Sequence, residues 1–463
     1  MAAVVLRSSL ARAPSKVPSL LTRGYATSTP VRAHHRVVVV GGGTAGVTVA
    51  AQLKRTPQLE NSDVAILDPA PVHHYQVSAD PTPPPRVITD TSQPGWTLVG
   101  SGLKPLDGMK RPLADVVPMG VKHYPLTVST FDPENNVVKT SEGVNVSYDY
   151  LVVAPGLETN FASVSGLQEA LADPTSQVSS IYSHKTVEQV WRNIQDFKEG
   201  KAIFTQPAGV IKCAGAPQKI LWMALSQWNR NGVRGDIDAT FATGAASMFA
   251  VPKYSEALER LRRERNVEGL FQHNLVAVDA KNKVATFKNL ADNDKEVQRE
   301  FGFLHVVPPQ KPWDWVAKSP LADAAGWVDV DKATTRHNKY ANVFSIGDAS
   351  SLPNSKTAAA ISAQAPVLVD NLLATMEGRK PEAAYDGYAS CPLLTGHNEL
   401  MLCEFKYGGV PKETFAGVFG SQDQPMRIFY HLKKDFFPAV YWNSFLKGTW
   451  FGPKGWSKPS SLS

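Results

Sequence analysis

Cys213 is the residue of this sequence whose surroundings most favour nucleophilic chemistry. It lies in VIKCAGAPQKI, next to Lys212, near Lys219 and just before the start of an expected helix. Nearby cations and the positive end of a helix dipole lower the pKa of a thiol and raise its thiolate fraction. The segment therefore predicts a reactive cysteine, against the alternative of a buried structural one, which is the commoner fate of a lone cysteine.

Two further cysteines complete the set, Cys391 in YDGYASCPLLTG and Cys403 in LMLCEFKYG. Three cysteines are too few for a disulfide framework, so any cysteine chemistry is expected to be catalytic. Cys403 belongs to an alternating strand pattern, and we interpret it as a packing residue. The histidine pairs at 34–35 and 73–74 lack the company that metal ligands need, so no metal site is predicted.

A dinucleotide site is predicted where VVVV meets GGGTAG. The four valines form a buried parallel strand, and Gly41, Gly43 and Gly46 follow it with G-x-G-x-x-G spacing. These glycines allow a tight turn, the close approach of a pyrophosphate and the close packing of the next helix.

The elements around this turn strengthen the prediction. Thr44 and Ala45 open a helix whose free N–H groups and dipole face the phosphates. The next hydrophobic strand, in DVAILDP, ends at Asp68, whose carboxylate can accept ribose hydroxyls. The alternative is a glycine-rich turn without a ligand.

The second α/β unit opens with the strand KAIFTQPAG but has no such fingerprint. The turn that should carry glycines for a nicotinamide nucleotide is instead the Cys213 segment. Binding of NAD(P)H is therefore disfavoured.

Alternating strands and helices predict an α/β fold with two Rossmann-like domains, the first discontinuous. A small-residue turn, Ala154-Pro155-Gly156, follows the strand YDYLVV, and YANVFSIGDAS returns to the same domain at Gly347 and Asp348. We assign residues 35–160 and 307–379 to the first domain, 161–306 to the second, and 380–463 to a membrane-associating C-terminal region.

The chain has 463 residues, 43% of them hydrophobic, which suits two or three globular domains. Its net charge of +6 does not argue for nucleic-acid binding, because much of the excess lies near the N-terminus. Residues 1–30 carry arginines and a lysine, and no acid occurs before Glu60. This segment resembles a mitochondrial transit peptide, against the alternative of a disordered basic tail.

Several segments, taken in order, resemble the sulfide:quinone oxidoreductases of the eukaryotic mitochondrial type. KCAGAPQKI and YDGYASCPLLTG are similar to the two cysteine segments of that family, and IGDASSLPNSKTAAA is similar to its second FAD motif. ADAAGWVDVDK and YWNSFLKGTWFGP also resemble family segments. The resemblance extends from about residue 35 to the C-terminus.

The resemblance implies an FAD enzyme of the inner mitochondrial membrane, exposed on the matrix side. Cys213 and Cys391 would lie on one face of the isoalloxazine ring, bridged directly or through extra sulfur. Hydrogen sulfide would attack the bridge and leave a persulfide on one cysteine, while the other reduces the flavin. The sulfane sulfur would pass to glutathione or sulfite, and ubiquinone would reoxidise the flavin.

Further flavin contacts follow from the same resemblance. Lys356 and the helix start at Ala358 would stabilise negative charge on the reduced flavin. Asp348 would bind a cofactor hydroxyl, and the backbone of Val128 would meet adenine. Gln76, in HHYQ, would be the glutamine of the flavin site.

The family pattern is interrupted after Gln76, where residues 77–93 separate it from PGWTLVG. A proline-rich surface loop is one interpretation. A retained intron is the other, because excision in frame would join Gln76 to Pro94, and it makes the flavin-site glutamine ambiguous between Gln76 and Gln93.

Residues 426–456 are rich in aromatic side chains with interleaved lysines. No run of 18 apolar residues occurs in the sequence, so we predict an interfacial, monotopic anchor instead of a membrane span. Pro438 is expected to split it into two short helices, and removal of the anchor is expected to leave the sulfide chemistry intact. The alternative is a core-packing or dimer-forming tail.

Two other functions remain open from the sequence. An NADH:quinone reductase is disfavoured by the missing second fingerprint. A non-catalytic, redox-responsive flavoprotein would require the cysteines to be dispensable.

Overall fold

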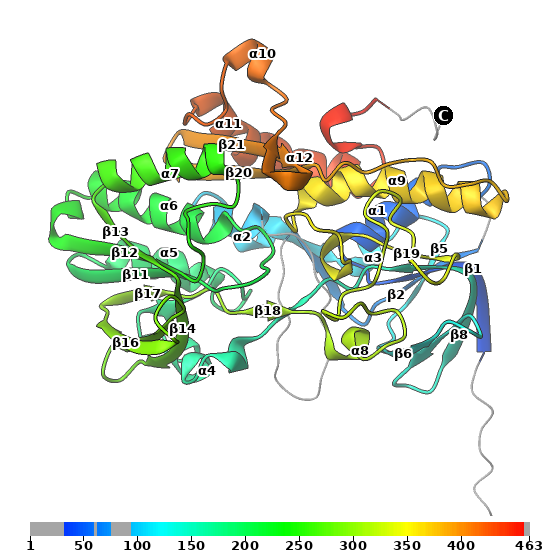
Figure 1. Ribbon diagram of the computed structural model, residues 1–463, viewed down its shortest axis with the longest axis horizontal. Coiled ribbons are helices and arrows are strands. Elements are labelled where there is room, and N and C mark those ends of the chain that lie inside the picture. Colours follow the sequence, from blue (N-terminus) through cyan, green and yellow to red (C-terminus); the bar gives the residue numbers. More distant parts are fainter. Residues whose placement is uncertain (1–31, 60–62, 76–93, 458–463) are drawn as a thin grey trace, which may run out of the picture.

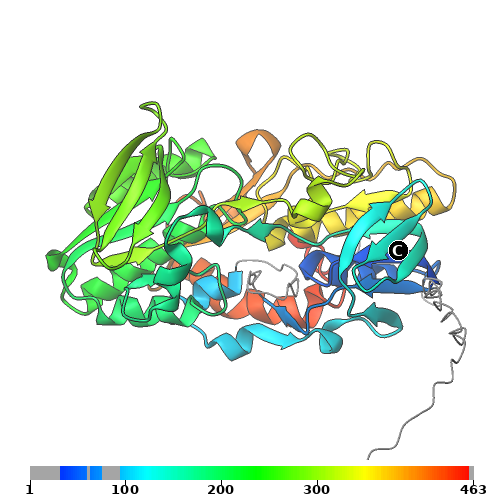
Figure 2. The same ribbon diagram turned by 90° about the horizontal axis from the view of Figure 1, so that it is seen from below.

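The computed structural model describes residues 32–59, 63–75 and 94–457 (Figure 1). Two α/β domains lie at opposite ends of the long axis, and C-terminal elements run along one edge of both (Figures 1 and 2). The transit-peptide prediction and the segment 77–93 lie outside the described residues, as does Gln76.

The first domain is built on a seven-stranded sheet. Its order is β5-β2-β1-β8-β7-β6, and β19 pairs with the second half of β8. The strands β5, β2, β1, β8 and β19 are parallel, whereas β6 and β7 form an antiparallel excursion. The bounds are β1 (Arg32–Val40), β2 (Val64–Leu67), β5 (Val121–Tyr124), β6 (Val128–Asp132), β7 (Val137–Thr140), β8 (Asn145–Val153) and β19 (Val343–Ser345).

Hydrophobic strands explain why this sheet is covered on both faces. Valines 37 to 40 are buried, and alternate ones belong to two different cores. Helices α1 (Thr44–Leu53) and α9 (Ala358–Met376) pack against each other over the sheet. Helix α9 is long and apolar enough to cross a membrane, but 67% of its most apolar window is buried inside the protein. That burial is typical of a core helix.

The second domain has a five-stranded parallel sheet in the order β10-β17-β11-β12-β13. An antiparallel three-stranded sheet, β14-β15-β16, stands at its outer end (Figure 2). The strands are β10 (Val178–Ser179), β11 (Gly200–Gln206), β12 (Ile237–Thr243), β13 (Val267–Phe271), β14 (His273–Asp279), β15 (Val284–Asn289), β16 (Lys295–Glu300) and β17 (Phe303–His305). Its helices are α4 (Leu167–Ala172), α5 (Val187–Asp196), α6 (Ala216–Arg230) and α7 (Pro252–Glu264).

The chain crosses between the domains twice, and the two crossings pair as β9 (Glu158–Thr159) and β18 (Gln310–Lys311). Smaller elements fill the spaces around them. They are β3 (Val72–His74), β4 (Lys110–Pro112), α2 (Pro94–Val99), α3 (Leu113–Val116) and α8 (Asp314–Ala317).

The C-terminal region begins with an antiparallel sheet and ends in helical turns. Strands β20 (Ala389–Gly396), β21 (Glu399–Lys406) and β22 (Val410–Pro411) pair in that order. Helices α10 (Ala416–Phe419), α11 (Arg427–His431) and α12 (Phe437–Val440) follow.

Pro438 does not split this region, contrary to the prediction. The segment 427–445 is helical throughout, because π-helical turns at Leu432–Phe436 and Tyr441–Phe445 flank α12 and the joining residues keep right-handed helical angles. Wider i→i+5 turns accommodate the missing proline N–H without a break. The segment is therefore one continuous helical stretch and not two separate helices.

Candidate functional site

Close backbone packing brings three of the predicted segments together. A Cβ on Gly41, which has a φ of +105°, would collide with the carbonyl of Ala154, and a Cβ on Gly46 would collide with the carbonyl of Gly41. A Cβ on Gly347 would lie 3.2 Å from that of Ala45. The glycine turn, the turn at 154–156 and the Gly347 segment thus meet around the start of α1, as a dinucleotide cradle requires.

The start of α1 also has the chemistry of a phosphate site. Gly43 is the N-cap residue, and no side chain caps the helix there. The first N–H groups of a helix have no partner within the helix, and the dipole places partial positive charge on them. The residues present therefore fit the pyrophosphate of a dinucleotide such as FAD.

Asp68 lies at the end of β2, as expected, and contacts the glycine turn. Its carboxylate accepts N–H groups from Gly42 and from Ala70, the latter at 2.8 Å. Burial raises the pKa of Asp68 to about 7, although both backbone hydrogen bonds oppose the shift. The N–H of Asp68 donates to the carbonyl of Tyr124. Val128 follows shortly after Tyr124 in the sequence and begins β6.

The third predicted group lies at the start of α9. Asp348 is buried in the turn Gly347–Ala349, and Thr357 caps α9, which begins at Ala358. The Lys356 ammonium donates to the carbonyl of Ser350 at 3.0 Å and lies 4.1 Å from the ring centre of Trp327.

The main chain of Lys356 forms an isolated bridge with Lys212. The residue before Cys213 is thereby tied to the residue before the N-cap of α9. This bridge joins the cysteine segment of the second domain to the predicted flavin contacts of the first.

Cys213 occupies a strained turn just before α6. Its φ is +81°, which is rare for a residue with a side chain and occurs where a site holds a group in place. The Lys219 ammonium lies 3.3 Å from the Cys213 Sγ, and Cys391 reaches the same sulfur from β20. Both sulfurs are buried and neither forms a disulfide, and the two cysteine segments named in the sequence meet here.

The surroundings shift the pKa values of Cys213 and Cys391 in opposite directions. A hydrogen bond from Cys391 and the ammonium groups of Lys219 and Lys433 lower the pKa of Cys213 to about 5, against the effect of burial. The same hydrogen bond and burial raise the pKa of Cys391 well above its ordinary value. The surroundings therefore favour the thiolate form at Cys213 and the thiol form at Cys391.

Sequence reasoning missed Lys433 as part of this site. It is 2% exposed, and burial, followed by repulsion from Lys219, lowers its pKa to about 7. In the sequence it is one of several lysines in an aromatic segment, and nothing in that pattern distinguishes the one that turns inward.

Replacing Lys219 with methionine should raise the pKa of Cys213, because an opposite charge at this distance favours the thiolate. The rate at which iodoacetamide alkylates Cys213 rises with pH as the thiolate forms. We expect the midpoint of this rise to lie about one pH unit or more higher in Lys219→Met than in the wild type. Lys219→Arg should restore much of the shift, and Lys198→Met, an exposed residue, should leave it unchanged. An unaltered alkylation profile in Lys219→Met would contradict the assigned role.

A single cavity connects these groups to the C-terminal region. Its volume is about 1160 Å³ including its mouth, and its lining is mostly apolar. Cys213 and Lys219 line one part of it, and the start of α9 lines another. The C-terminal aromatic residues in its wall are Phe436, Phe437, Tyr441, Phe445 and Trp450.

Tyr441 also reaches the glycine turn. His73 Nδ1 donates to the carbonyl of Gly42 at 3.0 Å, so its Nε2 accepts the Tyr441 hydroxyl at 2.8 Å. The Thr44 hydroxyl lies 2.7 Å from that of Tyr441. Burial lowers the pKa of His73 to about 4, which keeps the imidazole neutral in this arrangement. The tail therefore contacts the residues of the glycine turn, and whether the sulfide chemistry is independent of the tail stays a prediction.

Known proteins with similar sequences match this chain over most of its length. Residues 35–200 match the family described as pyridine nucleotide-disulphide oxidoreductase. The mitochondrial sulfide:quinone oxidoreductase of Schizosaccharomyces pombe is 45% identical over 92% of this chain and 93% of its own length. The chain belongs to the sulfide:quinone oxidoreductase family.

Two further relatives agree. The mitochondrial sulfide:quinone oxidoreductase of Mus musculus is 40% identical over 91% of this chain and 88% of its own. The solved structure of the sulfide:quinone oxidoreductase from Aquifex aeolicus superposes with a TM-score of 0.70 at 18% identity, covering 89% of this chain and 92% of that one. The predicted family and the α/β fold class are confirmed by these matches. Among the described residues, no group of three or more potential metal ligands comes together.

Proposed function

We propose that this member of the sulfide:quinone oxidoreductase family oxidises hydrogen sulfide at Cys213 and Cys391 and passes two electrons through FAD to ubiquinone. The observation that carries this proposal is the shared cavity. It joins a lysine-activated cysteine to the start of α9 and to an apolar wall of aromatic side chains. The proposed substrates, sulfide and a quinone, are those named in the relatives.

FAD, when bound, supplies the two-electron centre between the cysteines and the quinone. The glycine turn from Gly41 to Gly46 and the start of α1 would hold its pyrophosphate. Asp68, Val128, the turn at Ala154 and Gly156, and Asp348 would hold its remaining parts. The dipole of α9, which begins at Ala358, and the Lys356 segment would favour negative charge at the cavity.

Sulfide chemistry follows from the unequal thiols. In the oxidised protein, hydrosulfide attacks one sulfur of a Cys213–Cys391 bond, an S–S bond forms, and the other cysteine leaves as a thiolate. A thiol of low pKa leaves faster, so Cys213 departs, held by Lys219, and the persulfide remains on Cys391. The sulfane sulfur then passes to a small acceptor such as glutathione or sulfite.

A second cleft, beside the Cys213 segment, supports entry of such an acceptor. It is lined by Ile211 and Ala214, which flank Cys213, and by Lys356 and Lys406. These two ammonium groups favour anions, and both sulfite and glutathione are anionic at neutral pH.

Anaerobic titration of the purified flavoprotein tests the proposal. We expect sulfide to bleach the oxidised flavin absorbance with a stoichiometry of one sulfide per flavin, and NADH to leave it unchanged. Addition of a ubiquinone analogue should restore the absorbance. Bleaching by NADH instead of sulfide would favour an NADH:quinone reductase, and no bleaching by either would favour a non-catalytic flavoprotein.

The exposed apolar residues support membrane contact by the C-terminal region. Six of the nine large hydrophobic side chains that are exposed in the described residues lie between 410 and 456. Helices α10, α11 and α12 lie along one edge of the molecule (Figure 1). We infer that this edge contacts the inner mitochondrial membrane, on the matrix side. Quinone would enter the apolar cavity from the lipid, with no crossing of the bilayer.

Two substitutions on this edge test the membrane contact. Val418 is 77% exposed and Ile428 is 45% exposed, and burying each in lipid contributes about 1.5–3 kcal/mol. We expect Val418→Asp/Ile428→Asp to weaken binding to anionic vesicles by roughly 10²-fold and to leave sulfide bleaching unchanged. Met119→Asp/Leu290→Asp, exposed elsewhere, is the matched control. Equal vesicle binding by both variants would place the membrane contact on another surface.

A further inference from the structure

The third cysteine lies directly across a strand pair from a proposed catalytic one. In the antiparallel register of β20 and β21, Cys391 is opposite Cys403. Directly opposite residues of an antiparallel pair project their side chains from the same face of the sheet. Ser390 and Pro392 are opposite Glu404 and Leu402 and belong to the other face, which lines the cavity.

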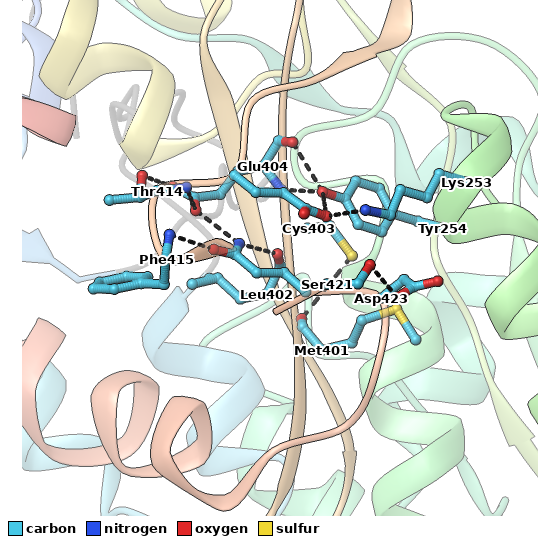
Figure 3. Close-up of polar contacts among 12 residues, drawn as sticks. Lys253, Tyr254, Met401, Leu402, Cys403, Glu404, Thr414, Phe415, Ser421 and Asp423 are labelled. Atoms are coloured by element: carbon cyan, nitrogen blue, oxygen red, sulfur yellow. Dashed lines mark hydrogen bonds and ion pairs between the residues drawn. The ribbon is translucent and has the colours of Figure 1, made fainter. Parts of the chain in front are cut away.

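The hydrogen bonds of β21 show whether Cys391 and Cys403 form a hydrogen-bonded or a non-hydrogen-bonded pair of the antiparallel ladder. The carbonyl of Leu402 accepts from Gln422, and that of Glu404 accepts from Lys412 and from the Tyr254 hydroxyl, so both point away from β20 (Figure 3). Pro392, opposite Leu402, has no N–H to donate. Because pairs alternate along the ladder, Cys391 and Cys403 form a hydrogen-bonded pair with Cα atoms about 5.5 Å apart. That separation lies within the range that disulfides span.

The surroundings hold Cys403 in this place. The Glu404 carboxylate accepts from the Thr414 hydroxyl (Figure 3), and also from the Tyr388 hydroxyl and the Gln422 amide, which fixes β21 against the following loop. Cys403 itself is completely buried, and burial raises the pKa of its thiol. The Lys219 ammonium acts on Cys403 as well as on Cys213 and Cys391. The positive charge of Lys219 therefore interacts with all three cysteine sulfurs.

We propose that Cys403 is a third redox-active sulfur, which exchanges with the Cys213–Cys391 disulfide to form a cross-strand Cys391–Cys403 disulfide. This proposal rests on the proposed redox role of Cys213 and Cys391. The Cys403 sulfur attacks the Cys391 sulfur, the Cys213–Cys391 bond breaks, and Cys213 leaves as the thiolate beside Lys219. The proton of Cys403 passes to solvent. One disulfide replaces another, so no oxidant or reductant is consumed.

The direction of exchange follows from the stability of the products. A disulfide that includes a low-pKa thiol is the more readily broken, because its released thiolate is stabilised. Cys213 is that thiol, whereas Cys391 and Cys403 both have raised pKa values. The exchanged form stores the oxidising equivalent away from the strained turn and leaves Cys213 as a thiolate.

Peptide mapping of the oxidised, full-length flavoprotein separates the two disulfides. After free thiols are blocked with N-ethylmaleimide, trypsin places Cys213 in peptide 213–219 and both other cysteines in peptide 380–406. A Cys391–Cys403 bond lies within one peptide, whereas a Cys213–Cys391 bond joins two. Cleavage after Glu399 opens the internal loop and leaves its halves linked.

We expect the internal disulfide in part of the wild-type protein, and in most chains of Cys213→Ser after oxidation with diamide. Cys213→Ser/Cys403→Ala should keep one alkylatable thiol at Cys391. If wild-type and Cys213→Ser chains both keep Cys403 fully alkylated, the proposal is wrong. Cys213→Ala repeats the test should the serine variant not fold. Failure of sulfide to bleach the wild-type flavin would overturn the proposed function and would leave the mapping result standing.

Discussion

Replacing Cys213 with serine is expected to slow sulfide-dependent reduction of the flavin by roughly 10³-fold or more, because residues that act as a unit fail together when one is removed. Cys391→Ser should have a similar effect. A serine hydroxyl cannot form the S–S bond that hydrosulfide attacks, and it cannot leave as a stabilised anion at neutral pH. Stopped-flow reduction by sulfide gives the rate, and the flavin-to-protein ratio shows that the cofactor is retained.

The double variant provides the control for this result. Cys213→Ser/Cys391→Ser should be no slower than either single variant, since the two sulfurs perform one step. A single variant that turns over at close to the wild-type rate would overturn the cysteine mechanism. A single variant that loses its flavin would point to a structural role for that sulfur instead.

Replacing Gly43 with valine is expected to remove the cofactor. Gly43 has a φ of −73°, which a valine can adopt, so the backbone itself should not be strained. The branched side chain would instead occupy the approach to the first N–H groups of α1, where the pyrophosphate is proposed to lie. We expect FAD affinity to fall on the order of 10²-fold, equivalent to about 2.7 kcal/mol, as measured by flavin fluorescence on dilution.

Gly235→Val is the matched control for this substitution. A Cβ at Gly235 meets open space, and the residue lies far from the glycine turn in the sequence, in the second domain. Its FAD content and thermal unfolding should match the wild type. A Gly43→Val protein that is purified with a full complement of FAD would refute the assignment of this turn.

Local spacing was sufficient to predict the glycine turn that precedes α1. Gly41 and Gly46 must be glycines because neighbouring carbonyls occupy the space of a Cβ, and such a constraint appears directly as a motif. The strand before them and the helix after them are also local patterns. The two cysteine segments were recognised by resemblance, since their contact between α6 and β20 depends on the whole fold.

The C-terminal tail shows what composition cannot predict. Aromatic and lysine content indicates an interface, but it does not separate side chains that face lipid from those that face the protein. Phe436 is partly exposed, whereas Lys433 and Tyr441 are buried in the site. The sequence predicts that Pro438 breaks the helix. The π-helical turns that accommodate this proline depend on i→i+5 hydrogen bonds, and no residue pattern predicts such turns.

The contact of Tyr441 with Thr44 and His73 would couple the proposed FAD site to the proposed membrane contact. A ligand that steadies the start of α1 also steadies the tail that rests on it, and a lipid surface that steadies the tail returns the same free energy to the ligand. An empty polypeptide would therefore hold its tail loosely and dock poorly, so the bilayer would select flavin-loaded molecules.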